Sequence, residues 1–361
     1  MSTMSKDSSQ AKSGAAAKPP NYKRLTDDDL FRHSSQYRFW SFVPDQLRQK
    51  RTELNAQAVN SVEQDLRNFI TEHKDQLTEE ELKVIEEKAV PVTVDEEVKL
   101  VNFYAQKVQD IAQRLNFPTE VVATSITFFR RFFLENSVMQ LEPKTIVFTT
   151  IFLACKSENY FIGIDWFAAK TKGSKEEILK YEFNLLESLK FCLMNHHPYK
   201  ALHGFFLDIQ VVLHGKVDLK YMGQIYDRCK RRITNALLTD AVYFYPPPQI
   251  TLAVLMLEDE ALTTRYLELK FHGNNYGDDA TKETEKSTEE TGISISFERL
   301  LSMITSCKDL IKNSPAVPVE EAKAIMAKVL YSKNPKVLLN KLKRKHSSEG
   351  QEASAEKKPK T

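Results

Sequence analysis

The sequence predicts an all-α protein that contains two tandem five-helix units, flanking N- and C-terminal helices, and disordered ends. Only 10 glycines occur in 361 residues. That is few for a β-protein, whose tight hairpins need positive φ angles. Ser/Thr-x-x-Glu capping boxes, in which a hydroxyl satisfies a free N–H at a helix start, begin at Thr78, Thr93 and Ser174. Prolines, which are favoured at the first helical position, mark further starts at Pro118, Pro143, Pro198 and Pro246.

The expected helices follow in order between these marks. Two amphipathic stretches, at 44–74 and 78–88, precede the first unit. The five helices of that unit are expected at 94–116, 119–135, 143–157, 163–170 and 175–190. The second unit is expected at 198–213, 218–239, 247–261, 263–270 and 296–313, with a further helix at 318–330.

Two of these helices are apolar on nearly every side. One follows Pro143 and the other follows Pro248, and each is the third helix of its series. A helix without a polar face must be surrounded by other helices. The two prolines are 105 positions apart, which suggests a duplicated unit of about 100 residues. From this spacing alone, a chance coincidence stays open.

Composition excludes several classes of protein. The chain carries 51 basic and 49 acidic residues, so no global charge attracts it to nucleic acid or anionic lipid. Its four cysteines form no Cys-x-x-Cys pair, which argues against a zinc ribbon and indicates a reducing compartment. The longest apolar stretch, 145–155, is far shorter than the roughly 20 residues that a membrane span needs. We expect a soluble, intracellular protein without a secretory signal.

No catalytic motif is present. The chain lacks the glycine-rich nucleotide loops, the zinc-protease motif and the kinase motifs. His196, His197 and His203 lie close together, but they do not have the i,i+4 spacing and third partner of a metal site. We interpret them as surface or hydrogen-bonded core histidines. We therefore expect no catalytic residue, no metal and no cofactor.

Two basic runs are ambiguous. In residues 128–133 the phenylalanines share one helix side, which predicts core phenylalanines and leaves Arg130 and Arg131 facing solvent. The run at 228–232 holds Arg228, Lys230, Arg231 and Arg232. We interpret it as a basic helix face, with nucleic-acid binding as the minority alternative.

Two charged residues fit less well with a purely structural role. Glu182 interrupts an apolar stripe that runs from Ile178 to Leu189, and Lys156 ends the first all-apolar helix. A charge beside a buried face is costly without a partner. Structural explanations stay open, because Lys156 suits a helix C-terminus and Glu182 could lie at the edge of the stripe.

At these residues the sequence resembles the cyclin family, and within it cyclin H. The resemblance rests on Phe-Phe-Leu-Glu-Asn-Ser-Val-Met at 132–139 and on Phe-Leu-Ala-Cys-Lys-Ser-Glu at 152–158. His-Pro-Tyr at 197–199, Gly-Phe-Phe-Leu-Asp at 204–208 and Tyr-Pro-Pro-Pro-Gln-Ile at 245–250 continue it. Ser-Ser-Gln-Tyr-Arg-Phe-Trp at 34–40 is similar to the start of cyclin H. The five-helix units would then be two cyclin boxes.

The resemblance implies a domain organisation. We divide the chain into a disordered N-terminal segment (1–32), an N-terminal helical extension (33–92), a first cyclin box (93–194), a second cyclin box (195–313) with an acidic loop at 272–292, a C-terminal helix (314–340) and a basic disordered tail (341–361).

The resemblance also implies a function. A cyclin is not itself catalytic, but binds a cyclin-dependent kinase and fixes the kinase αC helix in its active position. The kinase-binding residues carried over from the family are Lys156, Glu158, Glu182 and Phe191. The resemblance also implies that Lys156 and Glu182 pair with each other and with the kinase. The second box ends its third helix with Glu258 and has no lysine there, so only the first box should bind kinase. The first helix lacks the Met-Arg-Ala-Ile-Leu patch with which cell-cycle cyclins recruit substrates.

Likeness to cyclin H further implies a cyclin-dependent kinase catalytic subunit of the CDK-activating type, a RING-finger assembly subunit and the transcription factor IIH core as partners. The substrate would be the RNA polymerase II C-terminal repeat. No direct nucleic-acid or membrane contact is implied. The nucleus would be the location, and a possible import signal comprises Lys341, Lys343, Arg344 and Lys345. Two alternatives stay open: a cyclin C-like Mediator kinase subunit, and a nucleic-acid-binding core like that of transcription factor IIB.

Overall fold

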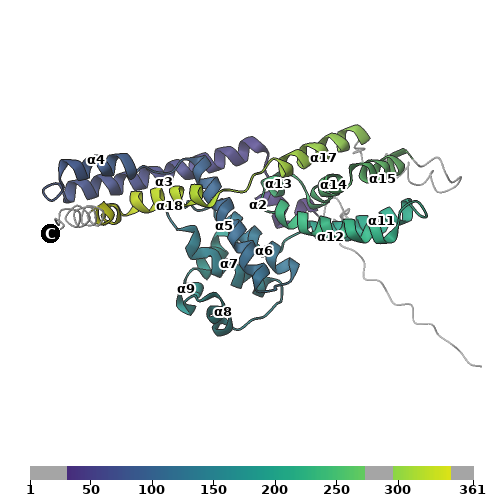
Figure 1. Ribbon diagram of the computed structural model, residues 1–361, viewed down its shortest axis with the longest axis horizontal. Coiled ribbons are helices and arrows are strands. Elements are labelled where there is room, and N and C mark those ends of the chain that lie inside the picture. Colours follow the sequence, from purple (N-terminus) through teal and green to yellow (C-terminus); the bar gives the residue numbers. More distant parts are fainter. Residues whose placement is uncertain (1–30, 273–295, 343–361) are drawn as a thin grey trace, which may run out of the picture.

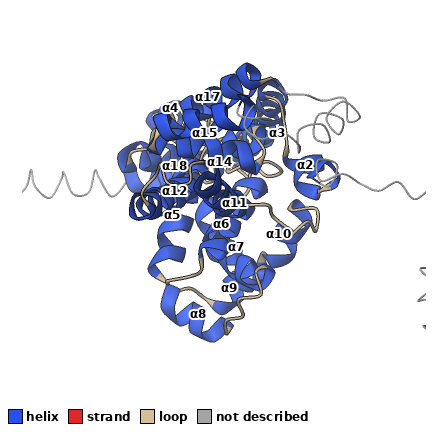
Figure 2. Ribbon diagram, turned by 90° about the vertical axis from the view of Figure 1, so that its right-hand side faces the viewer, coloured by secondary structure: helices blue, strands red, loops and turns tan. Residues whose placement is uncertain are grey.

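The computed structural model describes residues 31–272 and 296–342. All regular structure in this part of the chain is helical (Figure 2), which confirms the predicted all-α class. Most of the predicted N-terminal segment, acidic loop and basic tail lies outside the described residues. Within the described part, no helix combines the length and the apolar character needed to cross a membrane.

The first five-helix unit follows the helical residues 31–33 and three longer N-terminal helices. These are α2 (Ser35–Trp40), α3 (Pro44–Glu72) and α4 (Glu79–Lys88). The unit itself comprises α5 (Val94–Arg114), α6 (Thr119–Phe132), α7 (Pro143–Ser157), α8 (Ile164–Thr171), α9 (Lys175–Lys180) and α10 (Glu182–Ser188). The hydroxyls of Thr78, Thr93 and Ser174 accept hydrogen bonds at the starts of α4, α5 and α9, as the capping pattern predicts.

The second unit and the C-terminal region complete the fold. The unit comprises α11 (Pro198–Val212), α12 (Leu219–Ala236), α13 (Ala241–Phe244), α14 (Pro247–Glu258), α15 (Glu260–His272) and α17 (Phe297–Lys312). Then follow α18 (Val319–Lys333) and a helical stretch at 335–342. The apolar helices α7 and α14 are the central helices of their units, and residues of both belong to one continuous hydrophobic core.

The expected helix at 175–190 is divided in two. The helix is interrupted at Tyr181, between α9 and α10. Beside the break, the carbonyl of Ile178 accepts a hydrogen bond from Thr149 Oγ1 on α7 at 2.8 Å. Side-chain bonding of this kind competes with the helical ladder. The break leaves Glu182 as the first residue of α10.

The expected solvent exposure of Arg130 and Arg131 is wrong, because each is only 3% exposed. Helix α6 packs on α5 and α7, and side chains on its other side form hydrogen bonds with the second unit. Arg130 donates to the carbonyls of Leu237 and Thr239 at the end of α12. Arg131 donates to Asn195 Oδ1 at 2.7 Å. Burial lowers the pKa of Arg131 to about 10.

The C-terminal helix α18 packs against the N-terminal helices α3 and α4. Figure 1 shows α3, α4 and α18 side by side as an arm that extends from the two units. Its apolar interior contains Ile85, Ala89, Leu338 and Leu339. Helix α18 also covers α5, where Lys328 and Glu96 form an ion pair at 2.5 Å and Lys99 and Glu321 form another at 2.8 Å.

Candidate functional site

Lys156 and Glu182 meet at the surface of the first unit. Lys156 lies in the last turn of α7, Glu182 begins α10, and Lys156 Nζ donates to Glu182 Oε1. The exposed fractions of the two side chains are 38% and 21%. The ammonium lies 5.0 Å from the centre of the Phe152 ring. Partial burial lowers the pKa of Lys156. The pair is therefore formed in the free chain and stays accessible to a partner.

Exposed aromatic rings flank this pair. Phe183, the residue after Glu182, is 66% exposed, and Phe191 beyond the end of α10 is 61% exposed. Their ring centres are 6.1 Å apart in an edge-on arrangement. Met194 nearby in sequence is 72% exposed. Large apolar side chains grouped on a surface mark a place where another protein can bind.

A left-handed turn holds Phe191 outward. Lys190 and Phe191 both have φ near +54°, a conformation that costs a non-glycine residue about 1–2 kcal/mol. The ammonium of Lys190 lies 3.2 Å from Glu135 and 5.3 Å from the ring centres of Phe39 and Trp40. Sequence reasoning missed these contacts, because Lys and Phe give no local signal for positive φ.

Glu158 points inward rather than toward solvent. Thr124 Oγ1 on α6 donates to Glu158 Oε1 at 2.5 Å and lies 2.8 Å from His197 Nε2. Because the hydroxyl has one proton and gives it to the carboxylate, the histidine N–H must donate to the hydroxyl oxygen. Burial, together with the nearby Arg131 cation, lowers the pKa of His197. This series of hydrogen bonds, from Glu158 through Thr124 to His197, joins the end of α7 to the start of α11.

Asp240 joins three parts of the molecule. Its carboxylate accepts two hydrogen bonds from Arg51 of α3, at 2.7 and 2.8 Å, and one from Arg130 of α6 at 2.7 Å. Burial tends to raise the pKa of Asp240, but the hydrogen bond and charge of Arg51 and the charge of Arg130 outweigh it and hold the pKa below its usual value.

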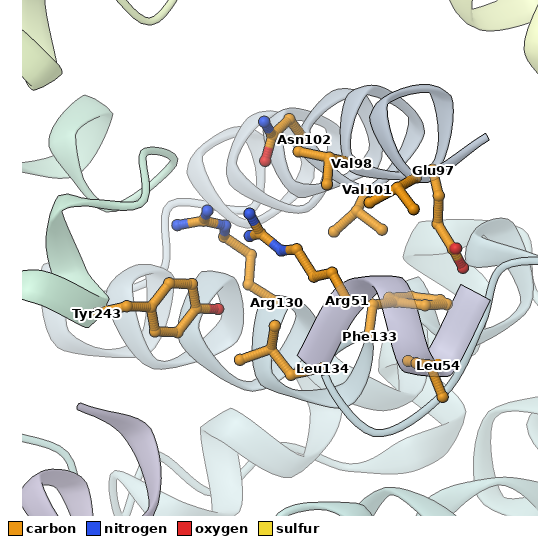
Figure 3. A pocket seen from close by; sticks show the side chains of 11 residues that line it. Arg51, Leu54, Glu97, Val98, Val101, Asn102, Arg130, Phe133, Leu134 and Tyr243 are labelled. Carbon is orange, nitrogen blue, oxygen red and sulfur yellow. The ribbon is translucent and has the colours of Figure 1, made fainter. Parts of the chain in front are cut away.

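A small cavity lies next to this junction. Figure 3 shows the guanidinium groups of Arg51 and Arg130 beneath the helix that carries Val98, Val101 and Asn102. The cavity measures about 20 Å³, the space of roughly one water molecule. It is too small for a cofactor. In the described ranges, no three His, Cys, Asp or Glu side chains are grouped to hold a metal ion.

The second unit ends its central helix differently. Glu258, the last residue of α14, pairs with Arg228 at 3.0 Å and also with Arg232. Both arginines belong to α12 of the same unit. Of the basic residues at the C-terminus, Lys341 is exposed and its ammonium lies 2.9 Å from Tyr331 Oη. Lys343, Arg344 and Lys345 lie outside the described residues.

Comparison with known proteins identifies related chains. The cyclin N-terminal domain model matches residues 72–194, and the cyclin C-terminal domain model matches residues 197–312. Cyclin CCL1 of Saccharomyces cerevisiae is 59% identical over 99% of this chain and 96% of its own length. Cyclin mcs2 of Schizosaccharomyces pombe is 35% identical over 67% of this chain and 73% of its own.

Solved structures agree. A chain of the yeast TFIIK (Kin28/Ccl1/Tfb3) complex matches 78% of this chain and 99% of its own length, with 57% identity and a TM-score of 0.60. A chain of the Chaetomium thermophilum CAK complex bound to ATP-γ-S matches 90% of this chain and 97% of its own, with 27% identity and a TM-score of 0.69. On these matches, the chain is a member of the cyclin family, with two tandem cyclin domains.

Proposed function

We propose that this cyclin is the regulatory subunit of a cyclin-dependent kinase of the CDK-activating, transcription factor IIH type. Its binding would support phosphorylation of the RNA polymerase II C-terminal repeat. The observation that carries the proposal is the 59% identity to Cyclin CCL1 over nearly the whole of both chains. Further support is the likeness to chains of the TFIIK and CAK complexes.

The kinase-binding surface is assigned to the exposed side of α7 and α10. Lys156 and Glu182 would bind backbone groups beside the kinase αC helix, and Phe191 would add an apolar contact. A rigid helical surface there selects the arrangement of αC in which its glutamate meets the ATP-binding lysine. The phosphoryl-transfer site then belongs to the kinase, and this chain acts as a regulator rather than as an enzyme.

Glu158 takes an indirect part in this surface. Its carboxylate is already bound to Thr124, so it fixes the end of α7 behind Lys156. We assign Glu158 the role of a positioning residue. Only its second carboxylate oxygen, Oε2, would be available for direct contact with the kinase.

The other partners follow from the relatives. The third chain of the TFIIK complex, Tfb3, supports a RING-finger assembly subunit as the third member here. The transcription factor IIH core would be the larger assembly, and the nucleus its location. Proteins that co-purify from nuclear extract separate this assignment from the cyclin C-like alternative, which would bring Mediator subunits instead.

Charge exchange tests the assigned surface. Glu182→Arg and Lys156→Glu should each weaken kinase binding by about 2–5 kcal/mol, because a charge at a buried interface loses its partner. The double exchange Lys156→Glu with Glu182→Lys restores the ion pair within the chain but presents reversed charges to the kinase. It should bind as poorly as the single variants in a kinase pull-down and calorimetric titration.

The second unit provides the matched control. Glu258→Gln removes the corresponding charge at the end of α14 and should leave kinase affinity unchanged. Full binding by the double exchange would mean that the pair has only a structural role. Full binding by both single variants, with melting temperatures unchanged, would place the kinase elsewhere.

A further inference from the structure

A basic cleft lies between the two cyclin domains. It measures about 380 Å³ and is formed by α5, α6 and α12. Its lining comprises Gln109, Gln113, Phe117, Thr119, Val122, Lys230, Arg231, Thr234 and Asn235. Figure 2 shows α5 and α12 at one edge of the molecule and α10 at the other. The cleft would therefore stay open when a kinase occupies the α10 side.

The cations of this cleft lack acidic partners, unlike their neighbours on the same helix. Arg228 and Arg232 are both bound by Glu258. Lys230 and Arg231 are exposed, and among the described residues neither side chain makes an ion pair or hydrogen bond. None of the nine lining residues is acidic. Two positive charges thus face a cleft that offers them no counter-charge.

Neutral hydrogen-bond donors accompany these cations. Within the described chain, the side chains of Gln113 and Thr119 have no hydrogen-bond partner. Gln109 donates to Asn235 at 3.1 Å, which bridges the two domains across the floor. Helix α6 starts at this cleft after Pro118, without a side-chain cap. Free N–H groups at this uncapped helix start add positive potential, which the exposed carboxylate of Glu120 in the first turn of α6 partly offsets.

The positive surface continues along α5. An adjoining shallow hollow shares Gln113 and is lined by Lys107, Asp110 and Arg114. Asp110 already accepts a hydrogen bond from Gln106 and lies 3.8 Å from Lys107. An extended ligand that leaves the cleft would therefore meet a further cation, Arg114, at its edge.

We propose that this cleft binds a phosphorylated peptide segment, with the phosphoryl group held by Lys230 and Arg231. Guanidinium and ammonium groups form charge-assisted bonds with phosphoryl oxygens, and arginine can do so in a bidentate way. A nucleic acid fits less well. Phe117, the one aromatic ring of the cleft, is 7% exposed and offers no stacking surface for a base. The assignment does not depend on the proposed kinase function.

The experiment uses the full chain and two fluorescent peptides that differ only in one phosphoserine. Anisotropy titrations should show the phosphorylated peptide binding about tenfold or more tightly than its unphosphorylated twin. The double variant Lys230→Ala with Arg231→Ala should remove this preference. Gln113→Glu, which adds a carboxylate to the cleft, should reduce affinity for the phosphopeptide by about tenfold as well.

The matched control removes two positive charges elsewhere on the same domain. Lys216 and Lys220 are exposed near the start of α12, and their double alanine variant should bind the phosphopeptide within about twofold of the original chain. An equal loss in both double variants would mean attraction by net charge alone and would overturn the proposal. So would equal binding of the two peptides.

Two further measurements complete the test. A single-stranded oligouridylate that binds more tightly than the phosphopeptide, and loses binding in the Lys230 and Arg231 variant, would replace the peptide by nucleic acid as the ligand. Kinase pull-down should be unchanged in that variant. Loss of phosphopeptide binding with kinase binding intact therefore separates this site from the proposed kinase surface.

Discussion

Each cyclin domain has its own central apolar helix, and the two helices differ in the charged residues at their C-terminal ends. Both α7 and α14 start at a proline and are buried on nearly every side. The last turn of α7 carries Lys156, which pairs with Glu182 on the exposed side of the first domain. Helix α14 ends at Glu258, which is held by two arginines of its own domain. Both terminal charges are paired within their own domain, but the Lys156 side chain is 38% exposed and accessible to a partner, whereas the Glu258 side chain is only 9% exposed.

This difference shows where the proposed kinase surface departs from the fold that the two domains share. The buried residues of the two central helices keep each domain folded and are mostly apolar in both helices. The surface depends on a few residues at the helix ends and on the turns that follow them. In the first domain these are the break before Glu182 and the left-handed turn at Lys190 and Phe191.

The largest expected effect concerns the junction that makes the two domains one body. Asp240→Asn leaves Arg51 and Arg130 facing a neutral amide, and should lower the free energy of unfolding by about 3 kcal/mol in urea denaturation. The control is Asp165→Asn, which breaks the exposed pair with Lys175 and should cost less than about 1 kcal/mol. Similar losses in the two variants would mean that apolar contacts alone join the domains.

The next effect is a pH dependence at the link between α7 and α11. The pKa of His197 is lowered in the folded chain, so its contribution to stability is complete above about pH 6.5. As the pH falls further, the unfolded chain takes up a proton that the folded chain does not. Stability should then fall by up to about 1.4 kcal/mol per pH unit.

His197→Gln removes this titration, because an amide does not take up a proton in this pH range. The amide N–H can still donate to Thr124, so the hydrogen bond is kept. Unfolding free energies of the two proteins should converge as the pH is lowered from 6.5, as measured by urea denaturation at several pH values. Parallel curves would show that His197 titrates alike in the folded and unfolded chains.

The smallest effect on stability concerns the turn that holds Phe191. Lys190→Gly relieves the left-handed backbone but loses the contacts with Glu135 and Trp40, so the free energy of unfolding should change by less than about 1 kcal/mol. Kinase affinity should nevertheless fall, because Phe191 is no longer fixed in place. Lys172→Gly is the control, since Lys172 is also left-handed (φ +56°) but ends α8.

The control variant should gain up to about 1 kcal/mol in stability without any change in kinase affinity. Thermal melts and kinase titrations of both variants give the comparison. Unchanged affinity in Lys190→Gly would mean that the turn contributes shape to the fold and nothing to binding.

The sequence was sufficient for the helices whose signals are local. Thr78, Thr93 and Ser174 predict helix starts because a capping hydroxyl acts within its own turn. Arg130 and Arg131 were misjudged because a helical period shows which residues share a face, but not that a second domain covers the other face. Lys156 and Glu182 stood out as ill-placed charges, and the expectation from the cyclin resemblance that they pair with each other is confirmed. The helix break at Tyr181 was not predicted, because no local pattern marks it.

The position of α18 and of the helical stretch 335–342 has a consequence for how the protein is made. The apolar face shared by α3 and α4 is closed by residues near the other end of the chain, including Leu338 and Leu339. During synthesis, the N-terminal extension therefore leaves the ribosome long before its covering helix exists. The apolar face of α3 and α4 therefore stays uncovered until residues 335–342 have been synthesised, roughly 250 residues later, and is open to non-native contacts during that time.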